Sequence, residues 1–316
     1  MKILWVNNVS SILGGTMQCT LCMIQALPDC EHSVFSFSRW PKDPDHPVGL
    51  RAGLLHGSSL AGLHGKYDLV VYQNISETRL PNKSLGFSVY IHHSSRADSL
   101  RVGKRCDMQL CVSYYLANLL GLPGSTVLHQ PVFGPSGSCR KPAEFTVGRI
   151  CTPTPKKWRE ADVLPAIESL LKTEPDVRVH LVGAPDSIGN LLCEEPRVKL
   201  SKPSLQAQGY MQKWHCLLNL SSVPETFGRT CREAQRRGCV PVVMAGSGYD
   251  EQVYGGAGFA VNSAGEAVSV VRRLMHGQEE YSATSQRCVE VGDQEGSLTV
   301  WRQRFLKRLE ESVNHG

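Results

Sequence analysis

Short apolar runs alternate with amphipathic stretches along the whole of this 316-residue chain. In the first half, the runs that predict strands are Ile3–Val6, Val34–Phe37, Asp68–Tyr72, Phe87–Ile91, Met108–Val112 and Ser125–Leu128. In the second half they are Phe145–Val147, Val177–Val182, Val198–Leu200, Cys216–Leu220, Val240–Val243 and Gly258–Val261. Apolar runs of strand length that alternate with helical periods are typical of βαβ units, so the pattern predicts an α/β fold with doubly wound parallel sheets.

A stretch rich in Pro, Gly and Ser, from Gln130 to Ala143, separates the two series of strands and has the composition of a linker. A chain of this length can bury two cores of ordinary domain size. We therefore predict one domain over residues 1–133 and a second over residues 144–298. In the last segment, 299–316, the residues Trp301, Phe305 and Leu309 recur at spacing i, i+4, i+8, which predicts an amphipathic helix.

The composition is that of an ordinary globular protein, with 41% hydrophobic and 20% charged residues. No stretch predicts a membrane span. The chain begins directly with a predicted strand, which leaves no room for a signal peptide, so we expect a cytoplasmic protein. The twelve cysteines are spread through predicted strands and helices, which indicates reduced, buried thiols. Cys19 and Cys22 have no partner pair at zinc-site spacing, and residues three apart in a helix share one face.

The segment from Pro224 to Ala234 carries the most informative pattern for function. It separates two carboxylates, Glu225 and Glu233, by seven residues across a predicted loop-to-helix junction. Between them, Gly228 allows the backbone to approach a ligand closely. The helix that follows would direct its unpaired N–H groups and the positive end of its dipole at that ligand, which predicts a phosphate site.

This segment, with Gly238 and the run Val240–Val243 after it, resembles the E-x7-E signature of retaining nucleotide-sugar glycosyltransferases of the GT-B fold, in particular family 4. Members of that family have two Rossmann-like domains. The resemblance implies that Glu225 holds hydroxyls of the transferred sugar and that Glu233 accepts hydrogen bonds from the nucleotide ribose. It also implies that the donor site includes Phe227, Gly228, Arg229 and Thr230.

The same resemblance bears on the last helix, which in this fold crosses back onto the first domain. An ordinary C-terminal helix of the second domain is the alternative for residues 299–316.

A second segment, Val147 to Trp158, resembles the part of the family in which an Arg and a Lys neutralise the departing nucleotide diphosphate. The match gives these roles to Arg149 and Lys156, while Lys157 stands where the family usually has Gly, so the choice between the two lysines stays open. Fixed cations in a dry cleft stabilise the charge that develops on the leaving oxygen better than water does.

The loop after the first predicted strand ends in Gly14 and Gly15, just before a predicted helix. Glycines permit close backbone approach to a diphosphate, and the helix N-terminus adds charge compensation. The loop departs from G-x-G-x-x-G, so it predicts no dinucleotide cofactor.

Two histidines, His92 and His93, follow the predicted strand that ends at Ile91. The family often carries a His at the end of this strand, near the transferred sugar and the attacking hydroxyl. An imidazole can hydrogen-bond a sugar hydroxyl or position an acceptor. Either histidine fits, and His92, which follows the strand directly, is the residue that we predict.

Together these segments predict a retaining, metal-independent hexosyltransferase that binds a nucleotide-sugar donor, expected to be UDP-linked, in a cleft between two Rossmann-like domains. The resemblance implies front-face attack, in which a donor phosphate oxygen takes the proton of the acceptor hydroxyl. We identify no metal site from the sequence, and no organic cofactor is expected. A sugar-nucleotide epimerase of the same fold and a non-catalytic nucleotide-sugar-binding protein are the alternatives.

The E-x7-E region does not identify the acceptor. The net charge of +5 and a basic cluster just after the predicted strand, formed by Arg96, Arg101, Lys104 and Arg105, would attract a phosphate backbone. A hydroxymethylated DNA base is therefore one candidate acceptor. Such clusters are also found on ordinary solvated helix faces, and the first domain has no basic amphipathic helix of the kind that binds membranes.

Overall fold

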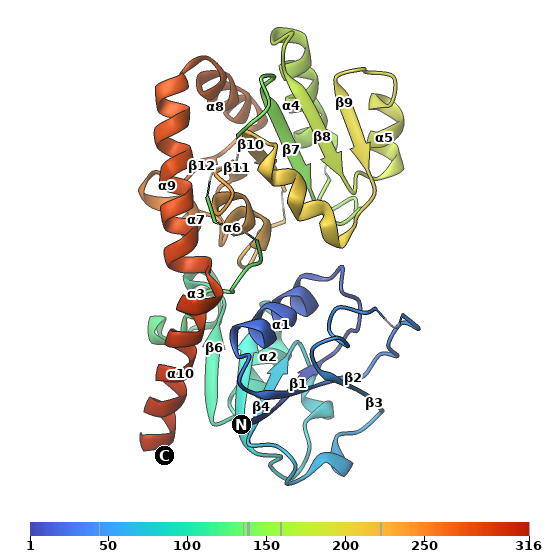
Figure 1. Ribbon diagram of the computed structural model, residues 1–316, viewed down its shortest axis with the longest axis vertical. Coiled ribbons are helices and arrows are strands. Elements are labelled where there is room, and N and C mark those ends of the chain that lie inside the picture. Colours follow the sequence, from blue (N-terminus) through green and yellow to red (C-terminus); the bar gives the residue numbers. More distant parts are fainter. Residues whose placement is uncertain (44, 135, 138–139, 159, 222, 316) are drawn as a thin grey trace. The chain divides into compact units, whose positions relative to one another are not determined.

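The computed structural model of the chain describes residues 1–43, 45–134, 136–137, 140–158, 160–221 and 223–315. The chain divides into two compact units. One consists of Met1–Val132 together with the segment that begins at Ser297, and the other spans Phe133–Gly296. Each unit contains a parallel sheet flanked by helices (Figure 1).

The sheet of the first unit has six strands in the order β3-β2-β1-β4-β5-β6. They are β1 (Lys2–Asn7), β2 (Glu31–Ser36), β3 (Gly53–His56), β4 (Leu69–Gln73), β5 (Phe87–His92) and β6 (Met108–Cys111). The helices are α1 (Gly15–Ala26), α2 (Ala97–Gly103), α3 (Tyr114–Leu120) and α10 (Leu298–His315), with short 3₁₀ helices η1 (Ala61–Leu63), η2 (Glu77–Arg79) and η3 (Gly124–Thr126). This strand order is that of a Rossmann fold.

The sheet of the second unit repeats the same order, β12-β11-β10-β7-β8-β9. Its strands are β7 (Thr146–Ile150), β8 (Arg178–Val182), β9 (Val198–Ser201), β10 (Cys216–Asn219), β11 (Val240–Met244) and β12 (Phe259–Val261). Its helices are α4 (Glu160–Thr173), α5 (Asp186–Leu192), α6 (Arg229–Gln235), α7 (Asp250–Val253), α8 (Ala264–His276) and α9 (Gln278–Gly296), with 3₁₀ helices η4 (Leu205–Gln212) and η5 (Tyr254–Gly256). The predicted α/β fold with two Rossmann-like domains is confirmed.

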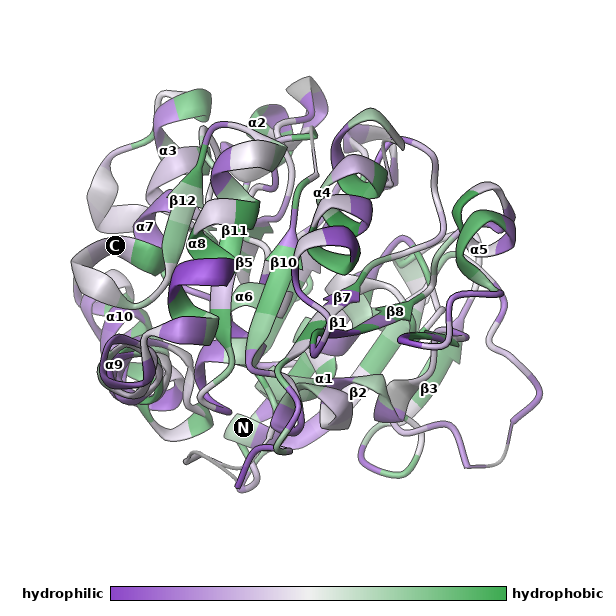
Figure 2. Ribbon diagram, turned by 90° about the horizontal axis from the view of Figure 1, so that it is seen from above, coloured by the Kyte–Doolittle hydropathy of each residue, from purple (hydrophilic) through white to green (hydrophobic). Residues whose placement is uncertain are grey.

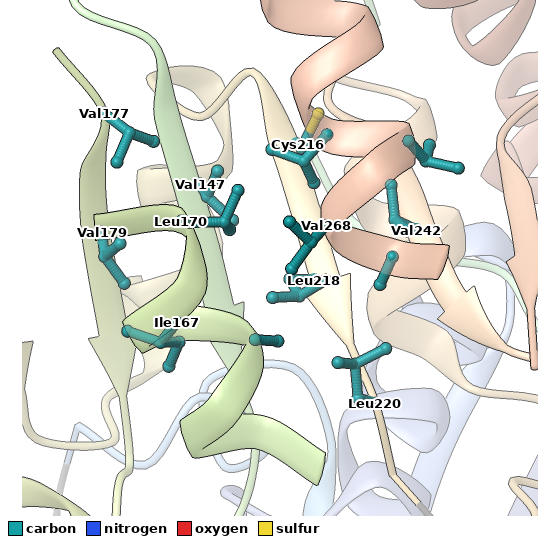
Figure 3. Close-up of a cluster of buried hydrophobic side chains, with 14 of the residues drawn as sticks. Val147, Ile167, Leu170, Val177, Val179, Cys216, Leu218, Leu220, Val242 and Val268 are labelled. Carbon is teal, nitrogen blue, oxygen red and sulfur yellow. The ribbon is translucent and has the colours of Figure 1, made fainter. Parts of the chain in front are cut away.

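The main core of the second unit lies between its sheet and the helices α4 and α8. Figure 3 shows Ile167 and Leu170 of α4 directed at Val147 and Val179 of the sheet, with Val268 of α8 over Leu218. The strands β10 and β11 are mostly in the hydrophobic colour in Figure 2, as expected for parallel strands covered on both faces. Burial on both faces produces the continuous apolar runs that predict these strands from the sequence.

The last helix, α10, packs along α1 within the first unit. Trp301, Phe305 and Leu309 are all buried, and the rings of Trp301 and Phe305 stack at a centroid distance of 4.6 Å. On the polar side, Arg302 Nη2 donates to Asp29 Oδ2 at 2.5 Å. The periodic apolar stripe therefore covers the first unit.

The strand order of each sheet reverses direction at its first strand. These switch points lie between β1 and β4 in the first unit and between β7 and β10 in the second. Loops on the two sides of such a point leave in opposite directions from the carboxyl ends of the strands and open a crevice there. Ligands of doubly wound folds bind at these positions, so the side chains at the ends of β1, β4, β7 and β10 are the first candidates for a site.

Candidate active site

Arg149 lies on β7 at the switch point of the second sheet, and only 1% of it is exposed. Its Nη1 donates to the carbonyl oxygen of Leu218 at 3.2 Å and to Asn219 Oδ1 at 2.9 Å. Its Nη2 donates to the carbonyl oxygen of Lys157, and its guanidinium carbon lies 4.7 Å from the centre of the Trp158 ring. Burial lowers the pKa of Arg149, yet a guanidinium keeps its proton in proteins. The switch point therefore holds a fixed, buried positive charge.

Lys157 extends from the loop after β7 toward Glu225. Its Nζ lies 2.6 Å from Glu225 Oε1, and both side chains are partly buried. Burial alone would lower the pKa of Lys157, but the charge of Glu225 and the hydrogen bond to it act the other way, and the pKa is raised. The neighbouring Lys156 is exposed. Of the two lysines that the sequence offers, the structure brings Lys157 to the predicted sugar-binding carboxylate.

The turn at Gly228 begins α6 with a left-handed backbone, φ 78° and ψ 66°. A Cβ atom at this position would lie 2.0 Å from Cε1 of the buried Tyr249. Only glycine fits both the dihedral angle and the space. The ring of Phe227 is buried, and the side-chain amide of Gln252 donates to the carbonyl oxygens of Phe227 and Gly228. The backbone turn in front of α6 is thus held from several sides.

Glu233, the second predicted carboxylate, lies on α6 and is only 2% exposed. Its Oε1 accepts hydrogen bonds from Arg229 Nη2 at 3.2 Å and from Gln208 Nε2 at 3.1 Å. Thr230, in the first turn of the same helix, is half-buried. Glu225 and Glu233 thus have different partners, a lysine for the first and an arginine with an amide for the second.

Four further residues of this site are not among those predicted from the sequence: Asn219, Tyr249, Gln252 and Gln208. Asn219 ends β10, accepts from Arg149 and donates to the Tyr249 hydroxyl oxygen at 2.5 Å. Burial, with the nearby charge of Glu225, raises the pKa of Tyr249 well above its ordinary value, so the phenol stays neutral. A polar residue at the end of an apolar strand is a recognisable signal for Asn219. Gln208 on η4, Gln252 on α7 and Tyr249 just before α7 carry no such signal.

His92 is completely buried at the end of β5. Its Nε2 lies 3.1 Å from Gln109 Oε1, and its ring packs edge-on against Tyr90 at 4.7 Å. A Cβ atom on Gly103 of α2 would lie 2.9 Å from its Nε2, so the ring faces the packed layer between sheet and helix. Burial lowers the pKa of His92 and favours the neutral ring. The structure thus surrounds this predicted site residue with core contacts.

His93 belongs to a buried network at the carboxyl edge of the first sheet. Gln130 Nε2 lies 2.8 Å from its Nδ1, and its Nε2 lies 2.8 Å from Gln73 Oε1. The amide of Gln73 donates in turn to Thr20 Oγ1 at 2.9 Å, and Asn7 Nδ2 donates to the same oxygen at 3.3 Å. Since an amide nitrogen donates to Nδ1 and an amide oxygen accepts from Nε2, the ring carries its proton on Nε2. Successive side chains point to opposite faces, which explains why the two histidines differ.

Gly14 and Gly15 lie where the loop after β1 meets α1. Gly14 caps the helix with an extended backbone and donates to the Ser11 carbonyl oxygen at 3.1 Å, and Gly15 is the first helical residue. Across the switch point, Asn74 follows β4 with φ 52° and donates to Thr16 Oγ1 at 2.8 Å. The two loops that flank the switch point are therefore tied together.

Two residues of the basic cluster after β5, Arg101 and Arg105, are paired with carboxylates. Arg101 Nε lies 3.0 Å from Glu77 Oε2, its Nη2 pairs with Asp98, and Arg105 Nη1 lies 3.9 Å from Glu77 Oε1. Helix α2 ends at Gly103, so Lys104 and Arg105 lie beyond its last turn. The arrangement reduces the positive potential that would attract a nucleic acid backbone.

Eleven cysteines in the described part of the chain are free thiols, and Cys19 and Cys22 are both buried in α1. Within the described ranges, no group of three or more His, Cys, Asp or Glu side chains is placed to hold a metal ion. Among the helices described, none is long and apolar enough to cross a membrane.

Comparison with known proteins yields matches only among solved structures. No protein-family model matches the chain, and neither does any curated protein sequence. The Anabaena protein HepE, solved with UDP-glucose, is similar with a TM-score of 0.74 and 18% identity, over 98% of this chain and 100% of that one. A glycosyltransferase from Rickettsia africae matches with a TM-score of 0.73 and 13% identity, over 100% of this chain and 99% of that one.

A Listeria monocytogenes protein assigned as a UDP-N-acetylglucosamine 2-epimerase matches as well. Its TM-score is 0.68 and its identity 10%, over 100% of this chain and 97% of that one. At these identities the likeness concerns the fold, which is the two-domain GT-B arrangement of Rossmann-like units.

Proposed function

We propose that the chain is a retaining glycosyltransferase that moves a sugar from a UDP-linked donor to an acceptor hydroxyl. The observation that carries the proposal is the Lys157–Glu225 pair beside the buried Arg149 at the switch point of the second sheet. This is a charged site where doubly wound folds bind nucleotides. The fold is also that of a protein solved with UDP-glucose, which supports the choice of donor.

The two members of the pair receive separate roles when the donor binds. Lys157 would turn from Glu225 to the diphosphate, and Glu225 would then accept hydrogen bonds from hydroxyls of the sugar. Because the pKa of Lys157 is raised, the lysine is protonated in the donor-free state and enters the reaction charged. Until the donor binds, the charges of Lys157 and Glu225 thus compensate each other.

The diphosphate would lie against the turn at Gly228, next to Arg229 and Thr230 at the positive end of the α6 dipole. Phe227 supports this turn from the core. Arg149 is held by three protein acceptors, so its contribution is the field of a fixed charge behind the site. Charge that develops on the leaving oxygen is stabilised by such preorganised groups.

The reaction we propose is front-face substitution. The acceptor oxygen bonds to the anomeric carbon on the side from which the diphosphate leaves, the bond from that carbon to the phosphate oxygen breaks, and the proton of the acceptor hydroxyl passes to a donor phosphate oxygen. The products are UDP and a glycoside of unchanged anomeric configuration. The scheme uses Lys157 and Arg149 as its cations and needs no metal ion.

In the first unit, we propose His93 in place of His92 as the imidazole next to the reacting hydroxyls. His93 lies at the carboxyl edge of the sheet among amides and a hydroxyl, whereas His92 is enclosed by core residues. We keep the cytoplasm as the expected location, since the described cysteines are free thiols.

The test is to incubate the protein with UDP-glucose and other UDP-sugars, with oligosaccharide, lipid and hydroxymethylated duplex DNA as acceptors. We expect UDP release that one acceptor class accelerates, and a product whose anomeric configuration matches the donor by NMR. The similarity to an epimerase makes that activity the second candidate. Inversion at C2 of UDP-N-acetylglucosamine without any acceptor would favour it, and tight UDP binding without turnover would indicate a binding protein.

Glu233→Gln is expected to weaken UDP binding by about 1.5–3 kcal/mol, because a ribose hydroxyl donates more strongly to a carboxylate than to an amide. The measurement is calorimetric titration with UDP, with thermal unfolding to show that the fold is kept. The matched control is Glu290→Gln on the exposed side of α9, which should bind UDP like the wild type. An unchanged dissociation constant in Glu233→Gln would exclude this carboxylate from the donor site.

A further inference from the structure

Gln208 is joined to the predicted ribose ligand from a separate part of the fold. It lies on η4, which follows β9, and its side chain is half-buried. Its Nε2 donates to Glu233 Oε1 at 3.1 Å, and Arg229 Nη2 donates to the same oxygen at 3.2 Å. Both hydrogen bonds therefore fall on one oxygen of the carboxylate, and neither uses Oε2.

The two donors restrain Glu233 in different ways. Arg229 is one helical turn away on α6, so its bond fixes the carboxylate relative to its own helix. Gln208 comes from η4 and holds the same oxygen from a second direction. Two donors on Oε1 fix the rotation of the carboxylate plane and leave Oε2 to accept from a ligand. Because Arg229 and Glu233 are both buried, little water is present to replace either bond.

We propose that Gln208 is a positioning residue that orients Glu233 so that the site distinguishes ribonucleotide from 2′-deoxyribonucleotide donors. The inference rests on the proposed function, because it takes Glu233 as the ribose ligand. A ribose 2′-hydroxyl donates to the oriented carboxylate oxygen. A 2′-deoxyribose has no such donor and leaves a buried carboxylate oxygen without a partner, which sites built to bind a hydroxyl reject strongly. The chain would therefore select UDP-sugars against dTDP-sugars that carry the same sugar.

The experiment compares UDP with 2′-deoxy-UDP by calorimetric titration. The wild type is expected to prefer UDP by about tenfold to a hundredfold, the usual range for one hydrogen bond to a charged group. In Gln208→Ala, the affinity for UDP should fall about tenfold while that for 2′-deoxy-UDP changes little, so that the preference largely disappears. Gln206→Ala, an exposed glutamine two residues away on η4, is the matched control and should keep the full preference.

A purely structural role for Gln208 makes a different prediction. In that case Gln208→Ala would bind UDP and 2′-deoxy-UDP more weakly by the same factor, and this result would overturn the inference. An unchanged preference for UDP in Gln208→Ala would overturn it as well. Gln208→Met keeps the length of the side chain without its donor and repeats the test if the alanine variant does not fold. If the wild type binds UDP but not more tightly than 2′-deoxy-UDP, this inference fails and the proposed donor site stands. Binding of neither nucleotide would overturn the donor site as well.

Discussion

Lys157→Ala is expected to reduce turnover of the donor by about 10²-fold or more, while Lys156→Ala should stay within about twofold of the wild type. The reason is the difference in position. Lys157 is partly buried, holds a raised pKa and lies 2.6 Å from Glu225, whereas Lys156 is exposed. A cation in a site of low dielectric stabilises the diphosphate most when its negative charge is largest, in the transition state. The measurement is UDP release from a saturating UDP-sugar.

The neighbouring lysine makes this test self-controlled. Both variants remove one ammonium from the same loop, so a general loss of positive charge would affect them equally. If Lys156→Ala shows the large loss and Lys157→Ala does not, the alignment of Val147–Trp158 with the family segment that gives Lys156 the diphosphate role is right. The pair with Glu225 is then a resting-state contact without a part in the reaction.

The strands of this fold can be predicted where burial is complete. The apolar runs of β1, β4 and β11 are continuous because both faces of a parallel sheet are covered. The edge strand β3 has only exposed and half-buried positions, so its sequence carries no such run. The predicted strand Ser125–Leu128 is wrong, because η3 starts at Gly124 and the segment forms only the single bridge between Val127 and Cys111.

The site is harder to predict than the fold, because its partners are distant in sequence. The E-x7-E pattern indicates Glu225 and Glu233, yet the contacts that distinguish them come from Lys157 and Gln208, 68 and 25 residues away. A sequence pattern cannot tell which of two adjacent residues faces a site when the strand end is uncertain by one position. For this reason the sequence alone leaves open the choices between Lys156 and Lys157 and between His92 and His93.

The two switch points have different chemistry although their sheets have the same strand order. In the first unit, neutral side chains form one chain of hydrogen bonds, in which each group donates to the next. It runs from Gln130 through His93 and Gln73 to Thr20, to which Asn7 also donates. In the second unit, charged groups dominate, with Arg149 and Lys157 against Glu225. Neutral donors and acceptors are suited to bind hydroxyls, and fixed cations are suited to bind a diphosphate. The contrast is the reason that the proposed donor site is placed in the second unit.

Gly228→Ala is expected to destabilise the protein by about 3–5 kcal/mol, the largest loss of stability among these variants. An alanine at this position would have to adopt an unfavourable left-handed backbone conformation. Its methyl group would also lie 2.0 Å from Tyr249 Cε1. Tyr249 cannot move away easily, because it is buried and its hydroxyl oxygen accepts from Asn219. The measurement is the free energy of unfolding from urea titration.

Gly246→Ala separates the two causes. Gly246 also has a left-handed backbone, with φ 85°, but a Cβ atom there would meet no other atom within 4 Å. Its substitution should therefore cost only the backbone strain, about 1–2 kcal/mol. The difference between the two variants measures the clash with Tyr249. Because that clash displaces the turn in front of α6, Gly228→Ala should also lose UDP binding, whereas Gly246→Ala should keep it. Equal losses of stability would mean that the contact between Gly228 and Tyr249 is not what fixes this turn.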